Sequence, residues 1–158
     1  MTKAAMLGEL AAMKDFFDRS TRALDEADSA FAPREGMFTV AQQVAHTAQT
    51  IEWFFDGAFA AAGFDLDFEG LEKSLRAVTS LSEARAWMDR ACAAAKASVE
   101  SRTEAEWAQL LPPGPIMGGQ PRFAILGALT DHTAHHRGAL TVYARLQGKV
   151  PPMPYMDM

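Results

Sequence analysis

Residues 121–148 read PRFAILGALTDHTAHHRGALTVYARLQG, and apolar side chains recur in this stretch every three or four positions. That spacing is typical of an α-helix with one face turned toward a core. Pro121 favours a helix start, and Gly148 favours a helix end. The stretch therefore predicts one long helix between these two residues. His132 and His136 fall in the middle of its apolar face, where other turns carry hydrophobic side chains.

Helical periods also run through most of the remaining chain, and few segments alternate like strands. The pairs Thr39/Gln42 and Ser80/Glu83 have the spacing of capping boxes. The expected helices span about 3–25, 39–63, 81–99 and 121–147, with short helical turns near 71–75 and 103–110. We predict an all-α fold, namely an up-and-down four-helix bundle whose longer connections carry short extra helices.

The composition predicts a single domain over residues 1–158, since 49% of the residues are hydrophobic and 22% are charged. The net charge of −5 argues against non-specific nucleic-acid binding, which needs a basic surface. No apolar run is long enough to span a membrane, and residues 1–17 lack the apolar core of a signal peptide. Cys92 is the only cysteine, so no intrachain disulfide can form. These features predict a cytoplasmic protein that binds neither nucleic acid nor membrane.

The two histidines of the last helix have the spacing of a metal-binding pair. His132 and His136 lie four positions apart, so a helix places both imidazoles on one face, one turn from each other. That spacing lets two ring nitrogens reach one ion. The alternative is a pair of hydrogen-bonded core histidines, although two unpaired imidazoles are costly to bury. The spacing alone leaves both interpretations open.

A third ligand would have to come from another helix, and His46 is the candidate. On a helical wheel it lies about 120° from the centre of the apolar stripe that includes Val44 and Ile51. It is therefore either an exposed or interface histidine, or a residue that faces the last helix across the bundle, as metal ligands in bundles do. His135 falls to one side of the inward face of the last helix and is not expected to join the pair.

Other chemical motifs are weak or missing from the sequence. It contains no HExxH zinc motif, nucleophilic serine elbow, phosphate-binding loop or dinucleotide-binding glycine pattern. Cys92, on an alanine-rich segment, fits a core position better than a nucleophile. Gln43, Glu52 and Asp131 are the candidates for a residue that orients a ligand histidine, and the sequence does not choose among them. For Arg137, an ordinary salt bridge is the favoured role, and binding of an anionic substrate is the alternative.

The chain resembles the DinB/YfiT-like family of metal-dependent enzymes over nearly its whole length. The resemblance rests on His46, on the run His132-x-x-His135-His136-Arg137-Gly138, and on the ending Gly148-Lys149-Val150-Pro151-Pro152. It implies a four-helix bundle in which His46, His132 and His136 hold a divalent ion, with Zn, Ni or Fe as the candidate metals. His135 is then not a ligand, and Ala139 replaces a Gln that the family often has.

The resemblance also implies thiol chemistry, because the family includes thiol-dependent S-transferases and a thiol-dependent isomerase. We therefore expect a metal-dependent enzyme with a small-molecule substrate and a low-molecular-weight thiol as cosubstrate; a metal-dependent hydrolase is the alternative activity. No catalytic residue is identified. The remaining hypothesis is a non-enzymatic helical protein with a structural metal. A homodimer is expected in either case, and Phe54, Phe55 and Phe59 could form its apolar face. Residues 112–121 form either a lid over the site or a plain loop.

Overall fold

The computed structural model describes residues 1–156, which are helical apart from connecting segments and one isolated bridge. The four long helices are α1 (Lys3–Thr21), α2 (Val40–Phe59), α4 (Leu81–Ser101) and α6 (Ala124–Leu146). The short elements are the 3₁₀-helix η1 (Glu26–Asp28), α3 (Phe68–Arg76) and α5 (Glu104–Ala108). The predicted all-α bundle with short extra helices in its connections is confirmed. Within the described residues, no helix combines the length and the hydropathy needed to cross a bilayer.

Most of the helices begin where a side chain satisfies free backbone N–H groups, whereas α6 has no side-chain cap. Thr39 and Gln42 form the predicted reciprocal capping box at the start of α2. At the start of α4, the Ser80 hydroxyl accepts a hydrogen bond of 3.2 Å from the backbone N–H of Glu83. Beyond the end of α6, Gly148 adopts a φ of +73°, a left-handed conformation that glycine tolerates best.

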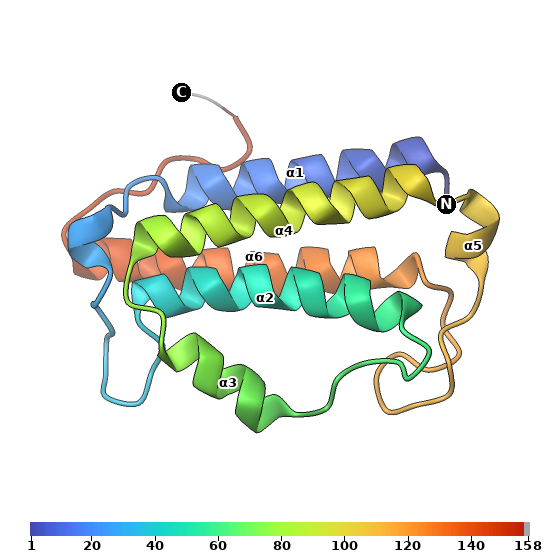
Figure 1. Ribbon diagram of the computed structural model, residues 1–158. Helices are drawn as coiled ribbons and strands as arrows, with labels where there is room; N and C mark the ends of the chain where they lie inside the picture. The colour runs from blue at the N-terminus through green and yellow to red at the C-terminus, as the bar shows by residue number, and fades with distance from the viewer. Residues whose placement is uncertain (157–158) are drawn as a thin grey trace.

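The four long helices do not alternate strictly in direction (Figure 1). α2 and α4 run parallel, because residues 60–80 carry the chain back to the end of the bundle where α2 began. Ser29 marks that end. Its carbonyl accepts a hydrogen bond from Ala41 near the start of α2, and its hydroxyl accepts one from Leu81 at the start of α4. The directions are therefore up-down-down-up, whereas we predicted simple alternation, because hydrophobic periodicity carries no record of the route of a connection.

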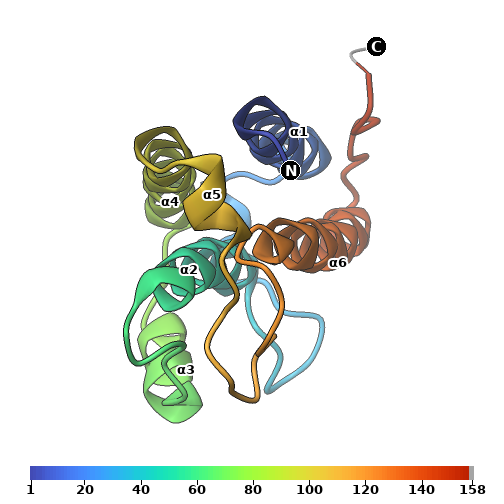
Figure 2. The ribbon, with the colours of Figure 1, turned by 90° about the vertical axis from the view of Figure 1, so that its right-hand side faces the viewer.

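α2 lies at the centre of the molecule, with α4 and α6 on two sides and α3 on a third (Figure 2). Fourteen of its 20 residues are buried. The surrounding helices contribute side chains such as Phe17, Met88 and Leu129, all at most 1% exposed, to the same core. Burial of this apolar surface is the main stabilising term of the fold. A residue of α2 that lies off its most apolar face therefore still faces another helix.

Two long helices end earlier than their periodicity predicts. α1 stops at Thr21, whose carbonyl accepts a hydrogen bond of 2.8 Å from Arg85 of α4. Asp25 then caps η1 with its side chain instead of closing α1. α2 stops at Phe59, since the next residue, Ala60, has an extended backbone with ψ of 138°. A tertiary hydrogen bond and the side-chain cap of η1 thus set the end of α1.

Two of the three aromatic residues predicted to form a dimer face are buried within this chain, and the third, Phe59, is partly buried. Phe54 and Phe55 are only 9% and 7% exposed. Phe59 packs edge-on against the buried Trp107, with 4.8 Å between ring centroids. A homodimer stays a prediction, and it would need a different surface.

Candidate metal centre

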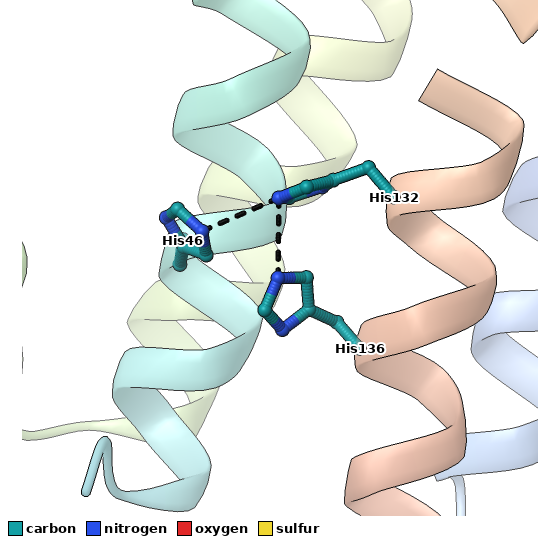
Figure 3. A group of neighbouring side chains, drawn as sticks. All are labelled: His46, His132 and His136. Atoms are coloured by element: carbon teal, nitrogen blue, oxygen red, sulfur yellow. Dashed lines mark hydrogen bonds between the residues drawn. The ribbon is translucent and has the colours of Figure 1, made fainter. Parts of the chain in front are cut away.

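Three histidine side chains from two helices meet between α2 and α6 (Figure 3). The Nε2 atom of His132 lies 3.3 Å from Nε2 of His46 and 3.1 Å from Nε2 of His136. These are the three residues that the sequence resemblance selected. Among residues 1–156, no carboxylate or thiol joins the group.

Helix geometry explains how the three rings come together. His132 and His136 lie one turn apart on α6 and project from the same side of that helix. His136 is buried, as are Leu129 and Tyr143 of the same face, whereas His132 is half-buried. His46 lies off the most apolar face of α2, on a side that faces α6. Of the two placements left open for His46, the one across from the last helix is therefore observed.

A hydrogen-bond chain holds the His136 ring in one orientation. Nδ1 of His136 lies 2.5 Å from the side-chain oxygen of Gln43, which can only accept, so Nδ1 carries the proton. The amide nitrogen of Gln43 donates to the Tyr143 hydroxyl at 3.4 Å, and this hydroxyl donates to the carbonyl of Phe38 at 3.2 Å. The Nε2 lone pair of His136 is thus directed at the other two histidines. Such partners commonly orient the histidines that bind metals.

The surroundings of the cluster favour neutral imidazoles. Burial, reinforced by the neighbouring histidines, lowers the pKa of His136 to about 3 and that of His132 to about 4. Burial also lowers the pKa of His46 below its usual value. A neutral imidazole has the free lone pair that a metal requires. The three rings are therefore in the protonation state suited to a cation near neutral pH.

Three neutral imidazoles cannot satisfy one another in this arrangement. Each neutral ring carries one N–H and one lone pair. His136 uses its N–H on Gln43, so its Nε2 offers only a lone pair. A proton on Nε2 of His132 could serve His136 or His46, but not both. In addition, Nδ1 of His46 and Nδ1 of His132 are buried without a hydrogen-bond partner among the described residues. A cation between the three Nε2 atoms would bind the lone pair of each of them, with the proton of His46 and of His132 on Nδ1.

Two of the three nitrogen separations agree with the size of a metal ion, and all three candidate ligand atoms lie within 4.8 Å of one another. Two nitrogens bound tetrahedrally to one zinc, each at ~2.0–2.1 Å, lie roughly 3.3 Å apart. The two Nε2 separations around His132 are 3.3 and 3.1 Å. Imidazole ligands suit Zn, Ni and Fe alike. The cluster can therefore hold a divalent ion, while the identity of the metal and the ligand role of each histidine stay predictions.

Comparison with known proteins agrees with this geometry. The sequence profile of the DinB family matches residues 1–158. The chain belongs to the DinB family. No curated protein matches the sequence. The family resemblance inferred from the histidine pattern is therefore confirmed over the whole chain.

A cavity of about 340 Å³ opens beside the histidines of this DinB family member. His46, His132 and Thr50 form its inner wall. The Thr50 hydroxyl lies 3.5 Å from Nε2 of His132. His136, only 8% exposed, does not line the cavity. A small molecule can thus reach the cluster from the side of His46 and His132.

The proline- and glycine-rich segment does not cover this cavity. None of residues 112–121 lines it. The segment closes on itself beside α5, where the backbone N–H of Leu111 donates to the carbonyl of Gln120 at 2.8 Å. The backbone N–H of Gly119 donates in turn to the carbonyl of Leu111 at 3.2 Å. This segment is therefore a plain loop, and the lid hypothesis is wrong.

The remaining residues singled out in the sequence lie outside the histidine cluster. His135 is exposed, as expected of a non-ligand. Asp131 is exposed too, and Glu52 lines a separate groove with residues of α4, so Gln43 is the one of the three candidates that orients a ligand histidine. Arg137 contacts the hydroxyls of Ser20 and Tyr155 between α6, α1 and the C-terminal segment. Tyr143 was not predicted as a site residue, because its helical position fits an ordinary core residue equally well.

Proposed function

We propose that this DinB family member is a metal-dependent enzyme that holds a divalent ion with His46, His132 and His136 and transfers a small electrophilic group to a thiol. The supporting observation is that two of the three histidines line an open cavity. A structural zinc site is normally closed by a fourth protein ligand. Residues 1–156 supply no such His, Cys, Asp or Glu ligand. This favours a catalytic site over a structural metal in a non-enzymatic protein.

The residues around the site have separate parts in this mechanism. When bound, the ion would supply a positive charge that lowers the pKa of a thiol or water. The three neutral imidazoles leave that charge uncompensated. Gln43 keeps Nε2 of His136 free of a proton. The Thr50 hydroxyl, beside His132 on the cavity wall, can donate a hydrogen bond to a substrate group that enters.

The thiol must come from a cosubstrate. Cys92 lies on α4, does not line the cavity, and has its pKa raised to about 11 by burial. It is therefore protonated at neutral pH and a poor nucleophile. In the proposed transfer, the cosubstrate's thiolate sulfur forms a bond to the electrophilic carbon. The leaving group departs with the electron pair of its former bond, and the thiol proton passes to solvent.

Turnover with a simple thiol and an activated aryl halide tests this function. Protein reconstituted with zinc should form the thioether faster than the uncatalysed reaction, lose this activity with a chelator, and regain it when zinc is added. His132→Ala should abolish the activity, whereas His135→Ala, its matched control on the same helix, should retain it. Turnover that survives both chelation and His132→Ala would contradict the proposal. Hydrolysis without thiol consumption would replace it with the hydrolase alternative.

A further inference from the structure

The cavity beside the histidines has an almost entirely apolar outer wall. Its large apolar side chains are Phe38, Trp53, Phe68, Leu71 and Leu75. They come from α2, from α3 and from the segment that precedes α2. Three of the five belong to α3, an element that a minimal four-helix bundle does not need. α3 therefore serves as a wall of this cavity.

Hydrogen bonds from α2 hold that wall in place. The Gln49 side-chain amide donates to the carbonyl of Leu71 at 3.2 Å and to the Ser74 hydroxyl at 2.9 Å. The indole N–H of Trp53 donates to the carbonyl of Asp65 at 2.8 Å, just before α3. These polar groups are thus engaged with the protein. The cavity is a formed site of a size that suits a small ligand.

No unpaired cationic side chain faces the cavity. Among the described residues, Glu72 is the only acidic one that lines it, and its carboxylate pairs with Arg76 at 3.0 Å. The Arg76 guanidinium lies 4.4 Å from the ring centroid of Phe38 and donates to the carbonyl of Gly36 at 3.0 Å. The guanidinium of Arg76 is therefore already engaged with Glu72, Phe38 and Gly36. An anionic group held against this wall, away from the histidines, would lose its hydration without gaining a partner.

Large apolar side chains lie exposed around α3. Phe68, which lines the cavity, is 55% exposed, and Leu66, two residues before it, is 51% exposed. Exposed apolar groups gathered next to a cavity are typical of ligand contact. This observation is independent of the histidines and points to the same apolar occupant.

We infer, on the basis of the proposed function, that the substrate is a neutral small molecule whose aromatic or branched apolar group fills this cavity. Its electrophilic carbon would then lie next to Thr50 and His132, which line the inner end. The wall formed by α3 selects for apolar groups, and because no free cation lies along it, carboxylates and phosphates are disfavoured on the part of the substrate that contacts this wall. Substrate class is thus set by α3 rather than by the metal ligands.

Binding of two matched probes to the metal-free protein tests this inference, because a bound zinc ion would itself attract the anionic probe. The neutral probe is 2-naphthol and the anionic one is 2-naphthoate, measured by titration calorimetry at pH 7. We expect 2-naphthol to bind saturably at one site per chain and 2-naphthoate to bind at least tenfold more weakly. No saturable binding of 2-naphthol, or equal binding of both probes, overturns the inference.

Substitutions in the wall locate the bound probe. Leu71→Ala should weaken 2-naphthol binding about tenfold through lost apolar contact. Phe68→Ala should weaken it as well without risk to folding, because this side chain is largely exposed. The control is Leu146→Ala, an exposed leucine near the end of α6 and outside the cavity. Unchanged affinity in both Leu71→Ala and Phe68→Ala contradicts the assignment.

Metal content separates this inference from the proposed function. If zinc binds through the histidines but 2-naphthol does not bind, only the substrate class is wrong. If the chain takes up no zinc but 2-naphthol still binds, and Leu71→Ala weakens this binding, the cavity assignment is supported. The metal-dependent function then fails.

Discussion

At the scale of single residues, the histidine cluster depends on a partner that does not line the cavity. Gln43 accepts the Nδ1 proton of His136 and donates to Tyr143, so it fixes both the tautomer and the tilt of one ring. Gln43 lies on α2, three residues before His46, and its hydrogen bond to His136 links α2 to α6. We regard Gln43 as a positioning residue for the centre.

Replacing Gln43 should weaken metal binding without unfolding the protein. We expect Gln43→Leu to lower zinc affinity roughly 10- to 100-fold, the usual effect of losing a partner of a ligand histidine. Gln43→Glu keeps an acceptor for the Nδ1 proton and should restore most of the affinity. Gln49→Leu, on the same helix but bonded to α3, is the control. Competition titration with a chromophoric chelator measures all four proteins, and equal affinity for Gln43→Leu and wild type would remove Gln43 from the site.

The buried histidines should make the metal-free protein less stable as the pH falls. An unfolded histidine titrates near pH 6.5, whereas burial lowers the pKa of His132 to about 4 and that of His136 to about 3. Between pH 6.5 and these values the unfolded chain binds protons that the folded chain excludes, so the free energy of unfolding decreases with decreasing pH. Urea unfolding at pH 7.0, 6.0 and 5.5 should show this decrease before most carboxyl groups titrate. The double variant His132→Leu/His136→Leu should have a flatter profile, and an unchanged slope would refute this explanation.

At the scale of elements, α2 shows why a helical wheel alone does not predict which residues are buried against a neighbouring helix. His46 lies about 120° from the apolar stripe, a position that suggests a surface residue in an ordinary bundle helix. α2, however, has neighbours on three sides, so this position faces α6. The wheel correctly oriented His132 and His136 because α6 has one dominant buried face. Family resemblance, rather than periodicity, selected His46 as the third member.

Close packing of α2 against the segment before α3 is tested by two glycine substitutions. A Cβ added at Gly57 would lie 2.3 Å from the ring of Phe64, whereas one added at Gly127 of α6 would meet nothing within 4 Å. We expect Gly127→Ala to stabilise the protein by up to ~1 kcal/mol through helix propensity. Gly57→Ala should instead destabilise it by about 1 kcal/mol, because overpacking outweighs the same helical gain. Denaturant unfolding of both variants gives the comparison, and a stabilised Gly57→Ala would show that Phe64 moves freely.

At the scale of the whole molecule, the sequence predicts the elements better than their arrangement. The long helices and the capping box at Thr39 follow from spacing and local chemistry, and both are observed. The parallel course of α2 and α4 does not follow, since it depends on how residues 60–80 cross the bundle. The apolar cavity escapes prediction for the same reason: it exists only because that crossing places α3 next to the histidines.

The fold of the whole chain brings together one histidine of α2 and two of α6. His46 and His132 are 86 residues apart in the sequence. The most direct test of this central claim is the zinc content of tag-free protein, measured by elemental analysis after equilibrium dialysis against zinc. Wild type and His135→Ala should each retain about one zinc per chain. His46→Ala, His132→Ala and His136→Ala should each lose more than about a hundredfold in affinity, beyond the effect of losing an orienting partner. Wild-type zinc content in any of these three variants, or none in the wild type, would contradict the three-histidine centre.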